Sequence, residues 1–205
     1  MVRRAIDVVV AGIALVVLSP VIAMIAVLIR VRMGAPVLFR QLRTGWRGNE
    51  FTIVKFRTMR NERYAGEPDA ERLTALGNWL RRTSLDELPQ LWNVLHGDMS
   101  LIGPRPTLPE QVANYSEHQR RRLEIRPGLT GWAQVNGRNS ISWPERIELD
   151  IWYIDHRSLR MDARIIGRTL RRLVRPAGIT GEGGVNPGFP VSDGDDSCPR
   201  PPSAQ

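Results

Sequence analysis

The sequence predicts a membrane-associated α/β domain with one re-entrant helix at its N-terminus, a short β-hairpin and several amphipathic interfacial helices. Three observations lead to this fold class. Residues 8–29 form an uncharged, mostly apolar run of 22 residues. Residues 37–39 and 51–54 are β-prone runs separated by a turn-forming segment at 45–49. From there to about residue 174, apolar residues recur at helical spacing between Gly, Pro and capping signals.

The apolar run is long enough to cross a bilayer. At ~1.5 Å per residue it makes a helix of ~33 Å, against ~30 Å for the hydrocarbon core. A signal peptide does not fit, because its apolar core is shorter and Arg30 and Arg32 follow the run directly. The run is therefore either a spanning helix or a hairpin that returns to the face it entered.

Ser19 and Pro20, near the middle of the run, favour the hairpin. Proline removes a backbone hydrogen bond and bends a helix. Each arm is then ~15–18 Å long, too short to span alone. Arginines flank both ends, whereas the positive-inside rule expects an excess on one side. Many spanning helices tolerate a proline, so the spanning helix stays open as the alternative.

Five helices are predicted after the β-hairpin, over residues 73–80, 84–95, 111–123, 143–153 and 162–174. Ser84 and Glu87 have capping-box spacing at the second of these, with Leu88 as the alternative start because Pro89 lies in the first turn. Ser142 and Glu145 have the same spacing at the fourth.

The last predicted helix is amphipathic. Its apolar residues are Ile165, Ile166, Leu170 and Leu173, and its basic residues are Arg164, Arg168, Arg171 and Arg172. This pattern suits an anionic membrane surface. A helix docked on its own domain would look similar.

The charge is unevenly distributed along the chain. Of the formal net charge of +8, residues 182–205 contribute −3, so the rest of the chain carries +11. Such a body favours anionic partners: nucleic acid, lipid headgroups or phosphorylated substrates. The single cysteine, Cys198, permits no disulfide framework, and the three histidines show no zinc-ligand spacing.

These features divide the chain into three predicted parts: a re-entrant membrane helix with basic flanks (1–32), a main domain (33–181) and a polar tail (182–205). The tail is rich in Gly, Pro, Ser and Asp, and we expect it to be disordered.

Asp86 and Glu87 are the first candidates for chemistry. Adjacent carboxylates at a helix start are often held only by the helix dipole. The alternative interpretation is functional: one of these carboxylates attacks a phosphoryl group or binds Mg²⁺. Arg105 lies in the stiff turn Pro104–Pro106 and suits a phosphate clamp. A second glycine-rich loop begins at Arg126 and runs into amide side chains that could bind a base or a sugar, or serve the turn's own backbone.

Lys55 is the only lysine beside 28 arginines. An ammonium acts on phosphate as a compact point charge, whereas a guanidinium is a planar fork. The presence of a lysine in so arginine-rich a chain indicates a specific role for Lys55. The alternative is that a single lysine has remained at this position by chance.

Four segments, taken in order, resemble the motifs of the bacterial sugar transferases, the small monotopic phosphoglycosyl transferases. They are KFRTM (55–59), SLDELPQL (84–91), GDMSLIGPRP (97–106) and RPGLTGWAQVNGR (126–138). The resemblance covers about residues 3–181.

The resemblance implies that Asp86 is the nucleophile and a Mg²⁺ ligand, and that Glu87 assists proton transfer from the acceptor phosphate. It places Pro104, Arg105 and Pro106 at the phosphate site and breaks a re-entrant helix at Ser19 and Pro20. The motif residues and their neighbours are then the candidates for substrate or phosphate binding: Lys55, Arg57, Arg82, Pro104, Arg105, Pro106, Arg126, Gln134, Asn136 and Arg138.

The implied reaction is a phosphotransfer. A sugar 1-phosphate moves from a UDP-sugar to polyprenyl (undecaprenyl) phosphate through a covalent phosphosugar-aspartate, and UMP leaves. This would be the first membrane step of surface polysaccharide or glycoconjugate synthesis, at the cytoplasmic face of the bacterial inner membrane. The expected partners are the two substrates, an anionic lipid membrane and downstream glycosyltransferases.

Two other classes of protein remain as alternatives. The basic body would suit a membrane-tethered nucleic-acid-binding protein, although no helix-turn-helix, zinc or aromatic RNA motif supports it. An inactive assembly scaffold could share the same fold.

Overall fold

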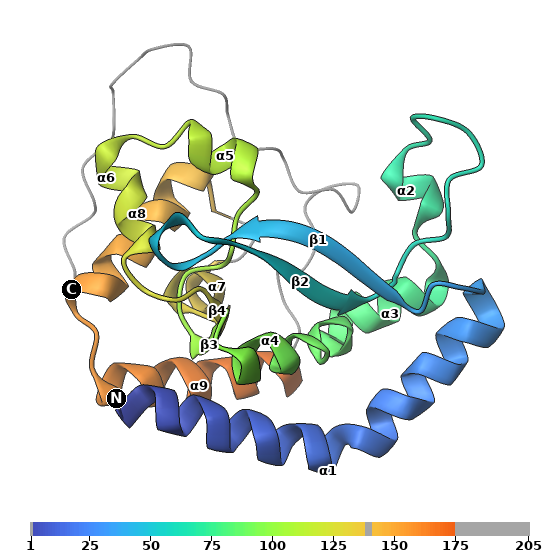
Figure 1. Ribbon diagram of the computed structural model, residues 1–205, viewed down its shortest axis with the longest axis horizontal. Helices are drawn as coiled ribbons and strands as arrows, with labels where there is room; N and C mark the ends of the chain where they lie inside the picture. The colour runs from blue at the N-terminus through green and yellow to red at the C-terminus, as the bar shows by residue number, and fades with distance from the viewer. Residues whose placement is uncertain (1, 138–140, 175–205) are drawn as a thin grey trace.

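The computed structural model describes residues 2–137 and 141–174. It is a mixed helix-and-sheet fold in which a long apolar helix, α1 (Val2–Met33), runs beneath the rest of the molecule. A two-stranded antiparallel sheet lies above it, and short helices fill the space around the sheet (Figure 1). The predicted tail and Arg138 lie outside the described residues.

Helix α1 is continuous across Pro20 but bends about midway into an open V, as Figure 1 shows. Pro20 has no N–H to donate to the carbonyl of Val16, one turn earlier. The Ser19 hydroxyl donates to that carbonyl instead, at 2.7 Å. The Ser-Pro pair therefore bends the helix without leaving this acceptor unpaired.

Both arms of α1 pack on the same body. Ala11 in the first arm is buried against Leu91 and Val94. Ile25 and Ile29 in the second arm are buried in a separate cluster with Phe56 and Leu80. Most other apolar residues of α1 are exposed, and α1 is the one described helix that is long and apolar enough to cross a membrane. A protein with such a surface is suited to a membrane location.

The predicted β-hairpin is confirmed and is longer than its β-prone runs. Strand β1 (Leu38–Thr44) pairs with β2 (Glu50–Phe56) in antiparallel register, from Leu38 opposite Phe56 to Thr44 opposite Glu50. Ile53 and Phe56 point into the core, each in the cluster formed by one arm of α1. The hairpin therefore joins both arms to one core.

The remaining described elements follow in chain order. They are η1 (Trp46–Gly48), α2 (Asp69–Arg72), α3 (Ala75–Thr83), η2 (Leu85–Glu87), α4 (Gln90–His96), β3 (Ser100–Ile102), α5 (Pro109–Ala113), α6 (Glu117–Arg120), η3 (Arg121–Leu123), β4 (Gly128–Thr130), α7 (Trp132–Asn136), α8 (Trp143–Asp155) and α9 (Leu159–Val174). Strands β3 and β4 form a short parallel pair.

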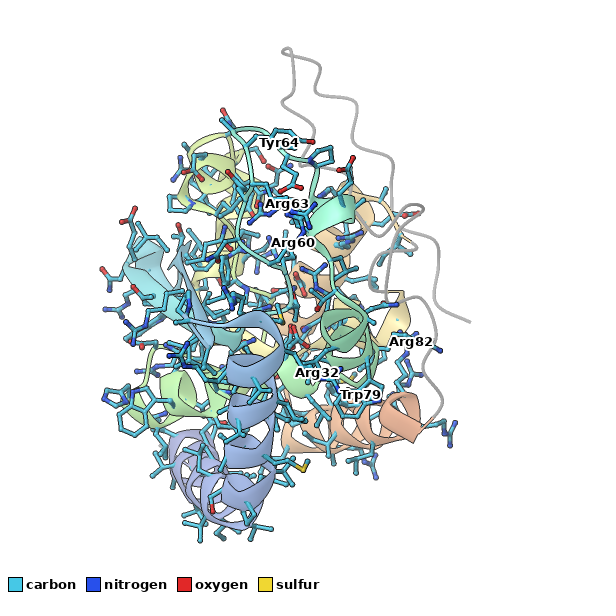
Figure 2. The ribbon with its side chains drawn as sticks, turned by 90° about the vertical axis from the view of Figure 1, so that its right-hand side faces the viewer. Arg32, Arg60, Arg63, Tyr64, Trp79 and Arg82 are labelled. Atoms are coloured by element: carbon cyan, nitrogen blue, oxygen red, sulfur yellow. The ribbon has the colours of Figure 1, made fainter. Side chains whose placement is uncertain are left out.

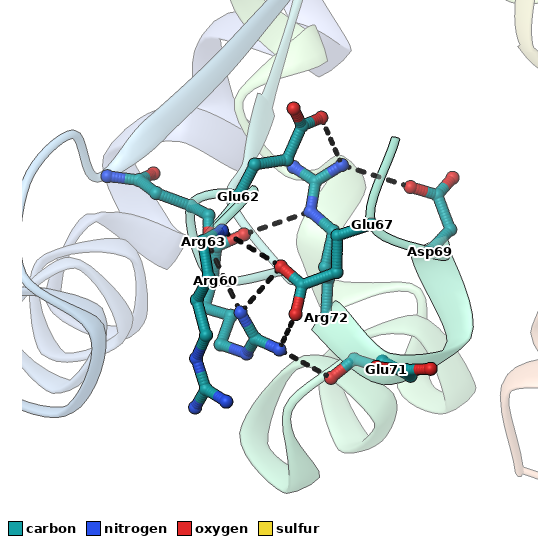
Figure 3. A network of polar contacts seen from close by, with 8 residues as sticks. Arg60, Glu62, Arg63, Glu67, Asp69, Glu71 and Arg72 are labelled. Carbon is teal, nitrogen blue, oxygen red and sulfur yellow. Dashed lines mark hydrogen bonds and ion pairs between the residues drawn. The ribbon is translucent and has the colours of Figure 1, made fainter. Parts of the chain in front are cut away.

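A projecting lobe, residues 60–72, is held together by charge pairs (Figure 3). Arg60 donates two hydrogen bonds to the carboxylate of Glu67, one of them at 2.8 Å. Arg72 pairs with Glu62 at 2.9 Å and with Asp69 at 3.2 Å. A lobe with few apolar residues is thus ordered by ion pairs rather than by a core.

The capping box predicted at Ser84 is wrong. Ser84 has a φ of 57° and is the C-cap of α3, where its N–H donates to the carbonyl of Arg81. The carboxylate of Glu87 is engaged elsewhere, by Lys55 and Arg105. Helix α4 begins only at Gln90.

The single helix predicted over residues 111–123 is also wrong. Asn114 ends α5, and Ser116 starts a new element because its hydroxyl accepts from the N–H of Gln119. The chain then continues as α6 and η3. The capping box of Ser142 and Glu145 is confirmed at the start of α8.

Helix α9 begins at Leu159, earlier than predicted, and its apolar residues face two ways. Ile165 is buried, whereas Ile166 and Leu170 are exposed; the side chain of Leu173 lies outside the description. One side of α9 therefore docks on its own domain, and a second apolar stripe remains on the surface.

Candidate active site

The two candidate carboxylates lie on η2, immediately after α3. Because Ser84 ends α3 in a left-handed conformation, the chain turns sharply and presents Asp86 and Glu87 beneath the hairpin strand β2. Lys55, on that strand, and Arg105, from the turn after β3, approach the same carboxylate. Residues distant in sequence thus form one charged cluster: Lys55, Asp86, Glu87 and Arg105.

Glu87 is the paired carboxylate of this cluster. Its Oε1 accepts from Lys55 Nζ at 3.0 Å and from Arg105 Nη2 at 2.7 Å. Burial alone would raise the pKa of Glu87, but the charges of Arg105 and Lys55 outweigh it and hold that pKa well below its ordinary value. Burial lowers the pKa of Lys55, although Glu87 opposes the effect. Glu87 is therefore ionised and fixed in place.

Asp86 is the unpaired carboxylate. It is only 9% exposed, and within residues 2–137 and 141–174 no group donates a hydrogen bond to it. Burial and the adjacent charge of Glu87 raise the pKa of Asp86 to about 6, while Lys55, Arg105 and Arg81 act in the opposite direction. A carboxylate whose oxygens are not taken up by hydrogen bonds has the chemistry needed of a nucleophile or of a cation ligand.

The turn that carries Arg105 is held by backbone contacts and by a buried arginine. The N–H of Gly128 donates to the carbonyl of Pro104 at 2.8 Å. Arg122 donates to the carbonyl of Arg105 at 3.2 Å and to Asp150 at 2.7 Å and 3.0 Å. Arg122 and Asp150 are both almost fully buried. The N–H of Gly128 and the guanidinium of Arg122 therefore hold the turn in place.

Arg122 and Asp150 were not found by the sequence analysis. Neither residue lies in the four motif segments given above, and their pairing joins η3 to α8, which the sequence does not reveal. The sequence analysis predicts a site role for Arg82 but not for the neighbouring Arg81. Arg81 donates to Thr58 at 3.0 Å and acts on the charge of Asp86, whereas the side chain of Arg82 is exposed.

Arg57, a predicted phosphate ligand, closes the end of α1. Its guanidinium donates to the carbonyls of Met33, Gly34 and Ala35 at 2.6–3.1 Å and to Asn61 at 2.7 Å. Four acceptors thus occupy it, and none of them belongs to the charged cluster.

The candidate side chains of the 126–136 segment bond groups outside the charged cluster. Arg126 donates to the carbonyl of Gly97 at 2.8 Å and lies over the ring of Trp46. Gln134 bonds the carbonyl of Leu129, and Asn136 accepts from Arg168 of α9. These contacts dock the segment on its own domain, and its substrate roles stay predictions.

A divalent cation would find few protein ligands here. Among the described residues, no group of three or more His, Cys, Asp or Glu side chains is placed to hold a metal. Mg²⁺ is commonly bound by one or two carboxylates together with substrate phosphates and water. The unpaired oxygens of Asp86 fit such a site, whereas those of Glu87 are partly occupied by cations.

Comparison with known proteins identifies the family of the chain. The chain is 48% identical over 164 residues to the uncharacterized sugar transferase EpsL of Bacillus subtilis, covering 78% of this chain and 81% of that protein. It is 36% identical over 190 residues to the exopolysaccharide production protein ExoY of Rhizobium meliloti, covering 83% and 84%. With the UDP-glucose:undecaprenyl-phosphate glucose-1-phosphate transferase of Escherichia coli it shares 39% identity over 181 residues, 82% of this chain but 39% of that protein. The family model of the bacterial sugar transferases matches residues 1–176, and the chain belongs to that family.

Proposed function

We propose that the protein transfers a sugar 1-phosphate from a UDP-sugar to polyprenyl phosphate and releases UMP, as an early step of surface polysaccharide or glycoconjugate synthesis. The observation that carries this proposal is the pair of unlike carboxylates. Asp86 is buried without a hydrogen-bond partner among the described residues, and Glu87 beside it is held by two cations. The names of the Escherichia coli relative and of ExoY support the reaction class and the pathway.

The chemistry has two steps. An oxygen of Asp86 attacks the sugar-bearing phosphorus of the donor, a new P–O bond forms, and the bond to UMP breaks. A phosphate oxygen of the acceptor then attacks the same phosphorus and releases the carboxylate of Asp86. Each step breaks one P–O bond and makes one, so the kinetics should be ping-pong.

Like charges oppose the first step, because a carboxylate must approach a diphosphate. Lys55, Arg105 and Arg81 lie around Asp86 and reduce that repulsion. Bound Mg²⁺ would supply the remaining positive charge, with Asp86 and the donor phosphates as its ligands.

Glu87 is suited to accept a proton once its cations are shared. While Lys55 and Arg105 bond only Glu87, its low pKa makes it a weak base. A phosphate that competes for these two cations would raise that pKa. Glu87 could then take the remaining proton from the acceptor phosphate.

We also propose that α1 is re-entrant, with both ends at the cytoplasmic face. At its start, Arg4 donates to the carbonyl of Val94 and Asp7 accepts from Ser100 at 2.8 Å. At its end, Arg57 holds the carbonyl of Met33 at 2.6 Å. Both ends are thus tied to one body by polar contacts, which a spanning helix would have to break.

The topology is tested with single cysteines near Arg4 and Arg32, with Cys198 replaced. An impermeant reagent on intact cells should label neither position. Labelling of one position from outside would indicate a spanning helix and contradict the proposal.

The surface stripe of α9 supports contact with anionic lipid. Leu159, Ile166 and Leu170 are exposed on this helix, with Arg160 and Arg164 beside them. Figures 1 and 2 both place α9 at the same end of the molecule as the first arm of α1. Arginines that border an apolar stripe are typical of helices lying at a membrane interface.

The reaction is tested by mass spectrometry of the intact protein after incubation with UDP-sugar and Mg²⁺ but no acceptor. The wild type should gain a phosphosugar, and Asp86→Asn should gain none. If product forms only when both substrates are bound together, the acceptor attacks the donor phosphate directly. Asp86 is then a metal ligand in that displacement, and the covalent step is wrong. If no UDP-sugar yields UMP under any condition, the inactive scaffold is favoured.

A further inference from the structure

Arg43, near the end of β1, is a half-buried arginine with few partners in the fold. Among residues 2–137 and 141–174, nothing accepts a hydrogen bond from its buried Nε–H. Its one hydrogen bond to a described residue runs from Nη2 to Oε1 of Gln41, at 2.6 Å, and it has no ion pair there. Arg57 also has a buried Nε without a partner, but four acceptors occupy its other nitrogens. A buried donor without an acceptor is rare in folded proteins and is often the sign of a functional role or a bound group.

Arg43 projects from the face of the hairpin that covers the charged cluster. Residues directly opposite each other in an antiparallel pair share a face, and each face takes every second residue. Arg43 is opposite Phe51 of β2, which lies on the same face as Ile53 and Lys55. Ile53 is buried in the core beneath the sheet, and Lys55 reaches Glu87 of the charged cluster. Arg43 therefore points to the same side as Lys55, nearer the hairpin turn.

The turn that carries Arg105 lies next to the end of β1. The N–H of Thr44 donates to the carbonyl of Thr107 at 2.9 Å, which pairs β1 with the residues after the turn. Thr44 and Arg105 also line one small cavity, and Figure 1 shows the end of β1 beside α5. Burial and then the charge of Arg105 lower the pKa of Arg43 to about 10, against the opposing charge of Glu110 on α5. Two like charges are thus held close together, and one of them is poorly solvated.

Arg105 links Arg43 to the nucleophile. Its Nη2 bonds Glu87 at 2.7 Å, and its charge acts on Asp86. Its charge acts on Arg43 as well, whereas the acidic side chain that acts on Arg43 is Glu110 and neither carboxylate of the charged cluster. Arg105 therefore lies between Asp86 and Arg43, and half of its side chain is exposed and able to meet a ligand. An anion between two arginines relieves their repulsion, and a phosphate can accept a planar fork of donors from each.

In-line displacement determines where a second phosphate must lie. When an oxygen of Asp86 attacks the sugar-bearing phosphorus, the oxygen of UMP leaves from the opposite side of that phosphorus. In the second step the acceptor oxygen attacks the same phosphorus opposite the Asp86 oxygen, so it enters where UMP left. A group on the far side of Arg105 from Asp86 would therefore meet both phosphates, one after the other.

We propose that Arg43 and Arg105 form one phosphate subsite, which binds the phosphate of UMP as it leaves in the first step and the phosphate of the acceptor as it attacks in the second. The proposal rests on the proposed function. In the first step the P–O bond to Asp86 forms and the bond to UMP breaks; in the second the bond to the acceptor forms and the bond to Asp86 breaks. Arg43 would neutralise the charge that develops on UMP. It would also hold the acceptor phosphate near Glu87, which Arg105 contacts.

The subsite is tested first without turnover, by measuring the binding of UMP to the purified protein in detergent. Arg43→Met should raise the Kd of UMP at least roughly ten-fold, as expected for loss of hydrogen bonds to a charged group. Arg43→Lys keeps the charge but not the planar fork, so its Kd should lie between those of Arg43→Met and the wild type. Uridine, which lacks the phosphate, should bind all three proteins equally. UMP binding that is unchanged in Arg43→Met would overturn the subsite.

The two half-reactions then test whether one subsite serves both phosphates. Enzyme loaded at saturating UDP-sugar and freed of UMP is mixed either with UMP, which regenerates UDP-sugar, or with an isoprenyl phosphate, which forms product. Arg43→Met should raise the apparent KM at least roughly ten-fold for both ligands, and in the wild type each ligand should compete with the other. A change confined to UMP or to the isoprenyl phosphate would indicate separate sites and overturn the shared subsite.

Arg40→Met is the matched control, because Arg40 is an exposed arginine of the same strand that lies on the opposite face of the hairpin, across from Val54. It should leave UMP binding and both half-reactions unchanged. Arg43→Met should not lower the Tm, since it removes a buried N–H without a partner among the described residues. A lower Tm with unchanged UMP affinity would make Arg43 a structural residue and overturn the proposal. A wild type that binds UMP through Arg43 but never loads Asp86 would instead contradict the proposed function and leave the phosphate subsite supported.

Discussion

Replacing the proposed nucleophile should stabilise the protein. Asp86 is a buried carboxylate that no described group hydrogen-bonds, and burial raises its pKa from 3.8 to about 6. Its charged form is therefore more costly in the folded protein than in the unfolded chain. Asp86→Asn keeps the shape of the side chain and removes that charge.

The size and pH dependence of the gain follow from the two pKa values. A carboxyl with a pKa of 3.8 unfolded and about 6 folded destabilises the protein by roughly 2–3 kcal/mol at neutral pH. The penalty is complete above about pH 6 and absent below the unfolded pKa. For a chain of this size, the gain corresponds to a rise in Tm of roughly 4–10 °C.

The assay is thermal unfolding of purified protein in detergent with a chelator, at pH 7.5 and at pH 4. The Tm of Asp86→Asn should exceed that of the wild type at pH 7.5, and most of this difference should be lost at pH 4, which is close to the unfolded pKa of 3.8. Added Mg²⁺ should narrow the gap at pH 7.5, because a bound cation would stabilise only the ionised carboxylate of the wild type.

Glu87→Gln is the matched control from the same turn, and its effect should have the opposite sign. The pKa of Glu87 is lowered in the fold, so its charge stabilises the protein, and Gln would leave the partly buried Lys55 without its charged partner. A Tm for Asp86→Asn equal to or below that of the wild type at pH 7.5 would refute the reasoning. So would a gain of equal size at pH 4.

Three further predictions concern residues other than Asp86 and Glu87. Lys55→Arg should lower the rate of UMP release at least roughly ten-fold, since a planar guanidinium does not fit the confined 3.0 Å contact that the ammonium makes with Glu87. Near-normal turnover would show that the ammonium of Lys55 has no specific role. Arg122→Met should destabilise the fold by about 3–5 kcal/mol because it leaves Asp150 buried and unpaired. The double variant with Asp150→Leu should regain most of that Tm but not the activity, and recovery of both would show that the bond to the Arg105 carbonyl is dispensable. Ser19→Ala should lower the Tm in bilayer discs, since one α1 carbonyl then faces lipid without a donor; an unchanged Tm would mean that this bond is not needed.

Much of this protein is determined locally by the sequence. The apolar length of α1, the bend at Ser19 and Pro20, the β-hairpin and the capping box of α8 follow from residue properties that act within a few positions. The adjacency of Asp86 and Glu87 is likewise visible in the chain, and it drew attention to the correct turn.

Tertiary structure decided how those residues differ. Asp86 and Glu87 have the same local chemistry, yet one is unpaired and the other is doubly paired because β2 and the turn after β3 deliver Lys55 and Arg105 to a single oxygen. The same packing turns Arg57 into the cap of α1. Burial and charge at a site depend on residues far apart in the chain, and no local pattern contains that information.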